Sequence, residues 1–558
     1  MGDDPRPGPG PLTAPETRHS PWATVHTRRT VLAVVHNVTA ATRLLDVLGV
    51  VGGDERVQLV FTVIGSSAFT DGTDDFLLDC GIVPTPWDEA VKAPVDLVIS
   101  ASYGGDLQLL KAPVVVVPHG MGYNKYLRRA GSDQPGQVFG LSPEWLLHDG
   151  QLIPELVVLS HPEQLDRLRL ASPAAAEKAL LAGDPCLDRM LAAAPLRPVY
   201  RRALGVGDGQ KLVMVSSTWG DASLFGQDPA LIRRLAARLP LDEYRIVVAL
   251  HPNVWAWHSS WQISRWTEDC RRSGVRVLPA REGWQAALVA ADVVIGDHGS
   301  VTFYGAAVGR PVLLASAPHD RVDPRSPIAM LLRTADRLHP TDDLPGQIER
   351  VTAGHDPARW RAITDLASST PGRSGELLRE AVYRLLGLDE PPWPADSRAA
   401  AVPPAQERTV TARLVRAEPD DDGTRIVRLP AEVSMASGPV TDGHVVVDAR
   451  EPLRRWLDLA DVVVVDDDAD LAAVLDGLPG CLLGTAPLGP DRRDWVVRTR
   501  DGRGLRFSGF SAAPGQDGRV WASVVYAWLA GGRDLGDLPG RSRVRLGGRV
   551  VEAVVSPC

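Results

Sequence analysis

Two histidines each follow an apolar run and stand where the chain must turn. His119 follows four consecutive valines and Pro118 and precedes Gly120, and His251 follows the predicted strand 245–250 and precedes a proline. An imidazole titrates near neutral pH, so it can take a proton from an attacking hydroxyl or contact phosphate oxygens. We predict that His119 is a general base and that His251 contacts a phosphate or a leaving group. Gly120 has no side chain, so we predict that the backbone there comes close to the bound phosphate donor. The alternative for each histidine is a structural role in its loop.

A third candidate lies at the start of a predicted helix that follows the apolar strand 293–295. The free N–H groups and the dipole at a helix start attract anions, and a glycine there allows a diphosphate to come close. We predict that this turn binds donor phosphates through Asp297, Gly299, Ser300 and Thr302. The alternative for Ser300 is that it only caps the helix.

Two smaller signals accompany these loops. Ser217 and Thr218 lie in a polar loop after the predicted strand 212–216, as expected of a loop that faces phosphate or ribose. His36 and Asn37 close the first predicted strand, so we expect them on the acceptor side of the site. The alternative for this pair is a role in packing their own loop.

Such residues need a scaffold that brings loops from different strands together. Short β-branched runs alternate with helical segments from Val31 onward, and the alternation restarts after two prolines near residue 198. Strands that are apolar throughout are buried on both faces, as in parallel sheets. The predicted strands are 31–36, 58–64, 96–100, 114–117 and 156–159, then 212–216, 245–250, 275–278, 293–295 and 311–314. We predict an α/β fold with two doubly wound, Rossmann-like units in tandem that face one cleft.

The same pattern divides the chain into five parts. We expect a disordered tail at 1–29, an acceptor unit at 30–195, a nucleotide-donor unit at 196–388, a Pro/Ala-rich linker at 389–407 and an accessory domain at 408–558. The accessory domain is predicted to be α/β or α+β. Among the predicted helices are 39–48, opened by a capping Thr39, and 259–272.

Composition narrows the class of protein. The 558 residues carry a net charge of −9, which argues against a general nucleic-acid binder. Five scattered cysteines form no C-x-x-C pair, which favours a reducing, cytoplasmic compartment. No apolar run approaches the length of a membrane span, so contact with a lipid-linked substrate at the inner face of a membrane would be peripheral. The acidic run 466–470 is more typical of a solvated turn than of a Mg²⁺ site, and we expect neither metal nor cofactor.

The order of these motifs resembles the CDP-glycerol glycerophosphotransferase family, whose members polymerise or prime teichoic acids and have the GT-B fold. The family's His-Gly, Thr-Trp, His-Pro and Asp-x-Ser-Ser motifs would correspond to His119-Gly120, Thr218-Trp219, His251-Pro252 and Asp297-His298-Gly299-Ser300. The connector 183–190 also resembles the family's Gly-x-Pro-x-x-Asp-x-Leu. The motifs span residues 110–320, and the pattern spans 30–388.

The resemblance implies a transferase that moves a polyol-phosphate group from a CDP-linked donor to a hydroxyl acceptor, with CMP as the leaving group. It implies that His119 is the base and that His251 and Ser300 hold the diphosphate. Two positions depart from the family: Gly299 replaces the first serine of the pair, and Gly220 stands where an arginine usually follows Thr-Trp. Two alternatives remain: a GT-B nucleotide-sugar transferase or UDP-sugar 2-epimerase, and a degenerate GT-B scaffold that only binds a partner.

Overall fold

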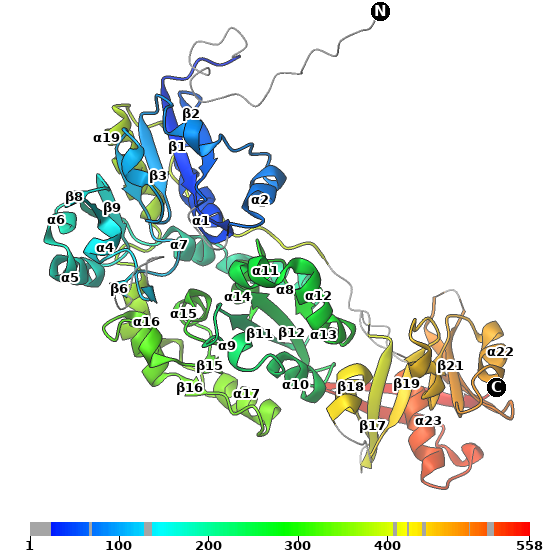
Figure 1. Ribbon diagram of the computed structural model, residues 1–558. Coiled ribbons are helices and arrows are strands. Elements are labelled where there is room, and N and C mark those ends of the chain that lie inside the picture. The colour runs from blue at the N-terminus through cyan, green and yellow to red at the C-terminus, as the bar shows by residue number, and fades with distance from the viewer. Residues whose placement is uncertain are drawn as a thin grey trace, which may run out of the picture.

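The computed structural model describes residues 24–65, 70–127, 137–405, 410–420, 423–437, 442–489, 491–509 and 518–558. Most of the predicted tail, residues 1–23, lies outside the described residues, and so do positions 406 and 407 of the predicted linker. The described residues form two parallel sheets with their helices, followed by a third unit built on a closed sheet (Figure 1).

The first sheet is parallel, with the order β10-β9-β4-β3-β1-β2. Its strands are β1 (Arg29–Val35), β2 (Val57–Val63), β3 (Leu97–Ser100), β4 (Val114–Val116), β9 (Leu156–Leu159) and β10 (Ala179–Leu181). Alternate residues of β1 enter two different apolar cores: Val31 and Ala33 enter one, and Leu32 and Val34 enter the other. Both faces of this sheet are therefore buried, as its apolar strands predict.

The second sheet repeats this design with the order β13-β12-β11-β14-β15-β16. Its strands are β11 (Lys211–Ser217), β12 (Tyr244–Leu250), β13 (Arg276–Val277), β14 (Val293–Gly296), β15 (Val312–Leu314) and β16 (Asp336–Arg337). Leu212 and Met214 enter the core on one face, and Val213 and Val215 enter the core on the other. In both sheets the strand order reverses at the first strand, which confirms two doubly wound, Rossmann-like units.

Helices cover these two sheets. In the first unit they are α1 (Val38–Leu48), α2 (Thr73–Asp79), α3 (Trp87–Ala90), α4 (Pro143–Leu146), α5 (Pro162–Ala171) and α6 (Pro173–Ala176), with the short hairpins β5 (Tyr126–Leu127), β6 (Gln137–Val138), β7 (Leu147–His148) and β8 (Gln151–Leu152). From the connection onward they are α7 (Pro185–Ala192), α8 (Arg197–Ala203), α9 (Leu224–Gln227), α10 (Leu231–Arg238), α11 (Pro252–His258), α12 (Ser260–Trp266), α13 (Glu268–Arg272), α14 (Trp284–Ala290), α15 (Ser300–Ala307), α16 (Pro327–Thr334), α17 (Leu344–Ala353), α18 (Arg361–Thr364) and α19 (Ser374–Leu386). Among the described residues, no helix combines the length and apolar character needed to cross a lipid bilayer.

The single helix predicted over 259–272 is wrong, because the structure has two helices there, α12 and α13. The interruption falls at Thr267, whose Oγ1 donates a hydrogen bond to the Ile263 carbonyl at 2.8 Å. A threonine hydroxyl that bonds back to the preceding turn commonly bends a helix. Helix α12 therefore ends at Trp266, and α13 begins at Glu268.

The last helix of the second unit packs against the first sheet (Figure 1). Leu378 and Val382 of α19 join the core formed by β1 and α1. The Tyr383 hydroxyl donates to Asp54 Oδ2 of the first unit at 2.6 Å. The chain thus crosses between the units twice, once through α7 and once on its way to α19, and these crossings hold the two sheet edges opposite each other.

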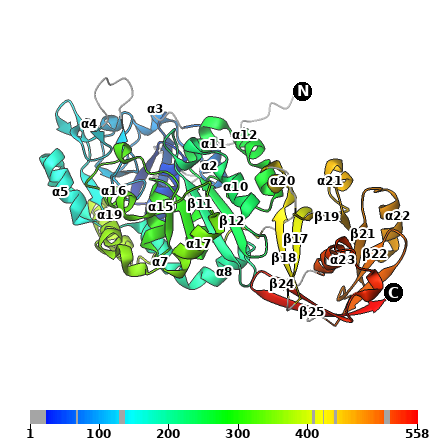
Figure 2. The same ribbon diagram turned by 90° about the horizontal axis from the view of Figure 1, so that it is seen from below.

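The third unit is a closed barrel of mixed strands with one helix packed inside it (Figure 2). Its strands are β17 (Ala412–Asp420), β18 (Gly423–Pro430), β19 (His444–Asp448), β20 (Val462–Val464), β21 (Leu483–Leu488), β22 (Asp494–Thr499), β23 (Gly504–Ser508), β24 (Arg541–Leu546) and β25 (Arg549–Pro557), and its helices are α20 (Ala431–Ser434), α21 (Arg454–Asp458), α22 (Leu471–Asp476) and α23 (Val520–Ala530). Trp521 of α23 is fully buried and stacks on Phe507 with ring centroids 5.1 Å apart. This helix therefore fills the core of the barrel.

The third unit is docked on the second through α20. Val433 inserts into the core of the second unit. Arg428 pairs with Asp242 at 2.6 Å beside it, and Glu432 pairs with Arg272 at 3.1 Å. An apolar anchor flanked by ion pairs fixes the orientation of the third unit relative to the second.

Candidate active site

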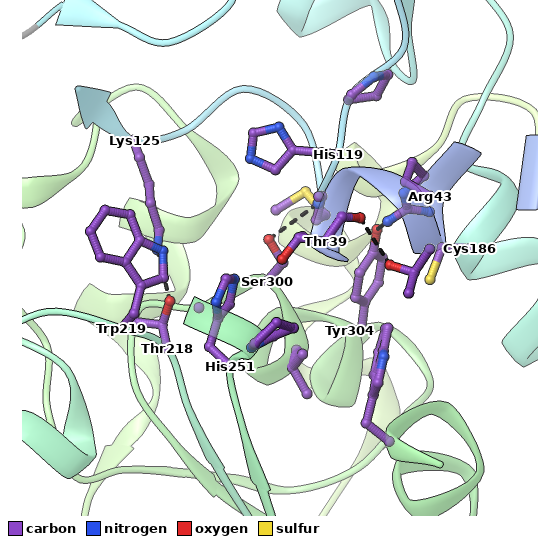
Figure 3. Close-up of a pocket in the computed structure, with 18 of the residues that line it drawn as sticks. Thr39, Arg43, His119, Lys125, Cys186, Thr218, Trp219, His251, Ser300 and Tyr304 are labelled. Atoms are coloured by element: carbon purple, nitrogen blue, oxygen red, sulfur yellow. Dashed lines mark hydrogen bonds between the residues drawn. The ribbon is translucent and has the colours of Figure 1, made fainter. Parts of the chain in front are cut away.

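A cavity lies between the first two units, at the carboxyl ends of their strands (Figure 3). Its walls include the loops after β4, β11 and β12, the start of α15, and one face of α1. Parallel strands present their carboxyl ends at one edge, so loops that are distant in sequence meet there. The predicted site residues that line the cavity are His119, Gly120, Ser217, Thr218, His251, Gly299 and Ser300.

Ser300 connects the two units across this cavity. It is the first residue of α15, and its Oγ accepts a hydrogen bond from the Met121 amide at 3.2 Å. A Cβ added at Gly120 would lie 2.8 Å from the same Oγ, so the absence of a side chain at Gly120 permits this approach. Ser300 therefore bonds to the opposite unit instead of capping its own helix.

His119 forms the first-unit wall directly opposite Ser300 (Figure 3). Its ring packs edge-on against Phe139, with ring centroids 5.3 Å apart. Burial lowers the pKa of His119 to about 4, and the positive charges of Arg43 and Lys125 add to the effect. The imidazole is therefore neutral at physiological pH and able to accept a proton.

His251 stands at the N-terminus of α11, where it caps the helix. Its Nδ1 accepts a hydrogen bond from the Asn253 amide at 3.1 Å. Burial, together with Lys125 and His119, lowers the pKa of His251 well below its usual range. The ring is thus neutral, and because Nδ1 is an acceptor its proton must be on Nε2. His251 can offer that N–H to a ligand while its other nitrogen holds the helix.

Lys125 is a cation of this site that sequence reasoning did not single out. Its Nζ donates to Thr218 Oγ1 at 2.8 Å and lies 5.6 Å from the centroid of the Trp219 ring. Burial lowers the pKa of Lys125 to about 8, against the opposing effect of Asp297. It comes from the loop that also carries His119, which is the signal that could have identified it.

Asp297 and Thr302, predicted as donor-binding residues, do not line the cavity. Asp297 is buried and accepts backbone N–H bonds from Thr218, Leu224 and Gly299 at 2.8 to 2.9 Å. Thr302 Oγ1 in turn accepts from the Asp297 amide at 3.1 Å. These contacts occupy both side chains and keep them out of the cavity wall where the prediction placed them: Asp297 and Thr302 tie the loops after β11 and β14 together.

The absence of a side chain at Gly299 leaves room for the side chain of Thr218. A Cβ added at Gly299 would lie 3.1 Å from the Thr218 Cβ and 3.1 Å from Asp297 Oδ1. That spacing is tighter than ordinary van der Waals contact, so a serine here would press on the loop that Lys125 contacts. Beside it, Ser217 Oγ accepts from the Phe225 amide at 2.9 Å and donates to the Thr218 carbonyl at 2.9 Å. Ser217 thus lines the cavity but mainly shapes its loop.

His36 and Asn37, predicted on the acceptor side, also lie outside the cavity wall. His36 is buried, and its Nε2 bonds to the Gly104 carbonyl at 2.7 Å. Asn37 caps α1 by accepting from the Ala40 amide at 3.0 Å, in place of the expected Thr39. The loop after β1 therefore packs within the first unit and caps α1. The residues of this region that face the cavity come from α1 itself.

Arg43 of α1 is the second cation that the sequence did not single out. Its guanidinium donates to the Tyr304 hydroxyl at 3.2 Å and lies 3.5 Å from Asp184. Tyr304 of α15 donates to the same Asp184, at 2.6 Å. Burial opposes the charge of Arg43, but Cys186, Tyr304 and Asp184 together raise its pKa. This group joins α1, α7 and α15 at one end of the cavity (Figure 3).

Carboxylates of the acidic run in the third unit form ion pairs or hydrogen bonds within that unit. Asp466 pairs with Arg492 at 3.1 Å, and Asp468 pairs with Arg498 at 2.8 Å. Asp467 accepts from the amide of Ala469 at 3.0 Å. Within the described ranges, no group of three or more His, Cys, Asp or Glu side chains is arranged to hold a metal ion.

No protein-family model and no curated protein matches the sequence. Among solved structures, the chain is similar to the wall teichoic acid polymerase TagF at 14% identity, over 65% of this chain and 91% of that one, with a TM-score of 0.42. It is also similar to S. aureus MnaA bound to UDP, at 12% identity over 65% and 99% of the two chains with a TM-score of 0.41. The UDP-GlcNAc 2-epimerase of Methanocaldococcus jannaschii matches at 10% identity over 63% and 99%, with a TM-score of 0.41. These likenesses extend no further than the fold.

Proposed function

We propose that this chain is a transferase that moves a glycerol-phosphate-like, polyol-phosphate group from a CDP-activated donor to a hydroxyl acceptor. One observation carries the proposal: His119 of the first unit lines the same cavity as His251 and Ser300 of the second. The unit before residue 196 would present the acceptor, and the unit after it would hold the donor. The order of the motifs around these residues supports CDP-linked chemistry over a generic nucleotide.

The reaction needs one base and a diphosphate clamp. His119 takes the proton of the acceptor hydroxyl as its oxygen attacks the distal phosphorus of the donor. A new P–O bond forms to the acceptor, the bridging P–O bond breaks, and CMP leaves with the bridging oxygen. His251 donates its Nε2–H to a diphosphate oxygen, and the N–H groups at the start of α15 stabilise the growing negative charge.

Lys125 supplies positive charge on the diphosphate side. The position after Thr218-Trp219 is Gly220, so the loop offers no guanidinium of its own there. The Lys125 ammonium, held against Thr218 at 2.8 Å, brings a cation to the same loop from the opposite unit. A cation supplied in this way binds phosphate only when the two units are together, which couples donor binding to closure of the cavity.

Calorimetric titration with CDP, UDP and GDP tests the choice of donor. Preferential binding of CDP is expected, and a clear preference for UDP or GDP would defeat the CDP proposal in favour of a nucleotide-sugar enzyme. A hydroxyl acceptor that is lipid-linked would place the protein peripherally at the inner face of a membrane, so donor turnover should then rise with vesicles that carry such an acceptor.

Histidine variants test the mechanism. His119→Ala and His251→Ala should each lower turnover by about 10²-fold or more, the usual range for a lost acid–base group. His319 is exposed and lies outside the cavity wall, so His319→Ala serves as the matched control. Unchanged turnover in both cavity variants would leave a nucleotide-binding scaffold as the better account.

A further inference from the structure

An aromatic groove leads from the candidate active site toward the third unit. We define it by five rings, Trp219, Phe225, Trp257, His258 and Trp266. Trp219 lines both the active-site cavity and a neighbouring cavity of about 400 Å³ between α9 and α11. Phe225 and His258 line that neighbour and a further cavity of about 950 Å³. The three hollows therefore adjoin one another.

Two tryptophan rings of this groove are exposed to solvent. Trp257 is 69% exposed and Trp266 is 43% exposed. The His258 ring lies 5.0 Å from the Trp266 ring at an angle of 59°, and Phe225 lies 6.5 Å from Trp266. Large aromatic side chains are normally buried, and a cluster of them left open beside a cavity indicates a binding surface.

The charged side chains of the groove are already paired. Arg233 pairs with Asp269, and Arg265 pairs with Glu268. Arg272 contacts Glu432 at 3.1 Å. Each of these arginines lines the cavity of about 950 Å³, which we call the outer cavity. The wall of the outer cavity is therefore close to neutral and rich in hydrogen-bonding groups. A polyanion would need unpaired cations, whereas hydroxyl groups can bond to paired ones.

We infer that the aromatic groove binds a neutral, hydroxyl-rich chain, namely an oligosaccharide that carries the acceptor hydroxyl. Sugar rings have apolar C–H faces that pack on aromatic rings, and their hydroxyls bond to the paired charges alongside. Glu432 and Leu453 of the third unit also line the outer cavity, which would give that unit a part in holding the acceptor. This inference rests on the proposed transferase for the direction of the chain, because Trp219 is the ring of the groove that also lines the active-site cavity.

The chain offers a matched pair of variants. Trp257 of α11 and Trp261 of α12 are 69% and 70% exposed and lie four residues apart in sequence, but only Trp257 lines a cavity of the groove. Titration of the full-length protein with chitohexaose and maltohexaose, followed by tryptophan fluorescence and saturation-transfer NMR, should show saturable binding of at least one of them. Trp257→Ala should weaken it by about tenfold, which corresponds to about 1.4 kcal/mol.

The controls separate this inference from the proposed function. Trp261→Ala should change oligosaccharide affinity less than about twofold, Trp257→Phe should restore most of it, and CDP affinity should be unchanged in all three variants. Equal losses at Trp257 and Trp261, no saturable binding of either sugar at millimolar concentration, or tighter binding of an oligo(glycerol phosphate) would overturn the inference. Loss of CDP preference in the wild-type protein would instead defeat the proposed donor while sugar binding remained measurable.

Discussion

The Oγ of Ser300 accepts a hydrogen bond from the backbone amide of Met121, and this contact joins the two parallel-sheet units at 3.2 Å. Ser300 begins a helix of the second unit, while Met121 follows the His119-Gly120 loop of the first. The contact sets the separation between the proposed base and the proposed phosphate site.

A side chain at Gly120 should push the two units apart. The added Cβ of Gly120→Ala would lie 2.8 Å from Ser300 Oγ but 3.7 Å from Ser300 Cβ. We expect kcat/KM to fall by about tenfold, because small misplacements of reacting groups are costly. In a Ser300→Ala background, where the Oγ is absent, the same change should have little further effect. A double-mutant cycle measures this coupling.

The control for that cycle is Gly53→Ala. Gly53 has no neighbouring atom within 4 Å of an added Cβ, so the substitution should leave kcat/KM unchanged. Additive effects of Gly120→Ala and Ser300→Ala would contradict the proposed contact.

The pH profile of kcat/KM should be bell-shaped. The pKa of His119 is lowered to about 4, so the base is neutral, and active, above that pH. The pKa of Lys125 is lowered to about 8, so its charge, and with it donor binding, is lost as the pH rises through that value. These limbs belong to the free enzyme, which is what kcat/KM reports.

Lys125→Arg isolates the descending limb. An arginine stays charged over the whole accessible range, so the fall near pH 8 should disappear while the acidic limb remains. An unchanged alkaline limb in this variant would assign it to another group.

Substitutions of His251 should affect the stability of the protein and its turnover differently. Its Nδ1 caps α11, and asparagine is among the best N-cap residues, so His251→Asn should keep the melting temperature close to that of the wild type. His251→Ala should lose about 1 kcal/mol of stability through the missing cap. Both variants should lose turnover, because neither side chain places an N–H where Nε2 lies. Retained turnover in His251→Asn would show that the cap alone matters.

Tyr304→Phe should destabilise the junction of the units. The hydroxyl donates to Asp184 and accepts from Arg43, and both partners are buried. Removing a hydrogen bond to a charged group costs about 1.5–3 kcal/mol. The same change at Tyr126, which is 36% exposed, should stay within about 0.5 kcal/mol. Chemical denaturation compares the two, and equal losses would argue against a special role for the junction.

The strands of both sheets were largely predictable, and the missed ones show where such reasoning stops. Runs such as 31–35 and 246–250 are continuously apolar, as expected of a strand buried on both faces. β16 consists of Asp336 and Arg337, which carry no β-branched side chain, and it pairs only because β15 lies beside it. The barrel strand β24 alternates exposed and buried residues, and its closure depends on partners from distant parts of the chain.

The loops that line the candidate site were predictable from the amino-acid sequence alone. His119, His251 and Ser300 come after apolar strands, and in a parallel sheet the loops after the strands share one edge. Which side chains of those loops face the cavity depends on how the chain packs in three dimensions. It turned Asp297 inward onto three backbone amides and brought Lys125 against Thr218 across the gap between the units. The physical reason is that strand patterning specifies an edge, whereas side-chain direction and the spacing between edges depend on how α7 and α19 pack the two units together.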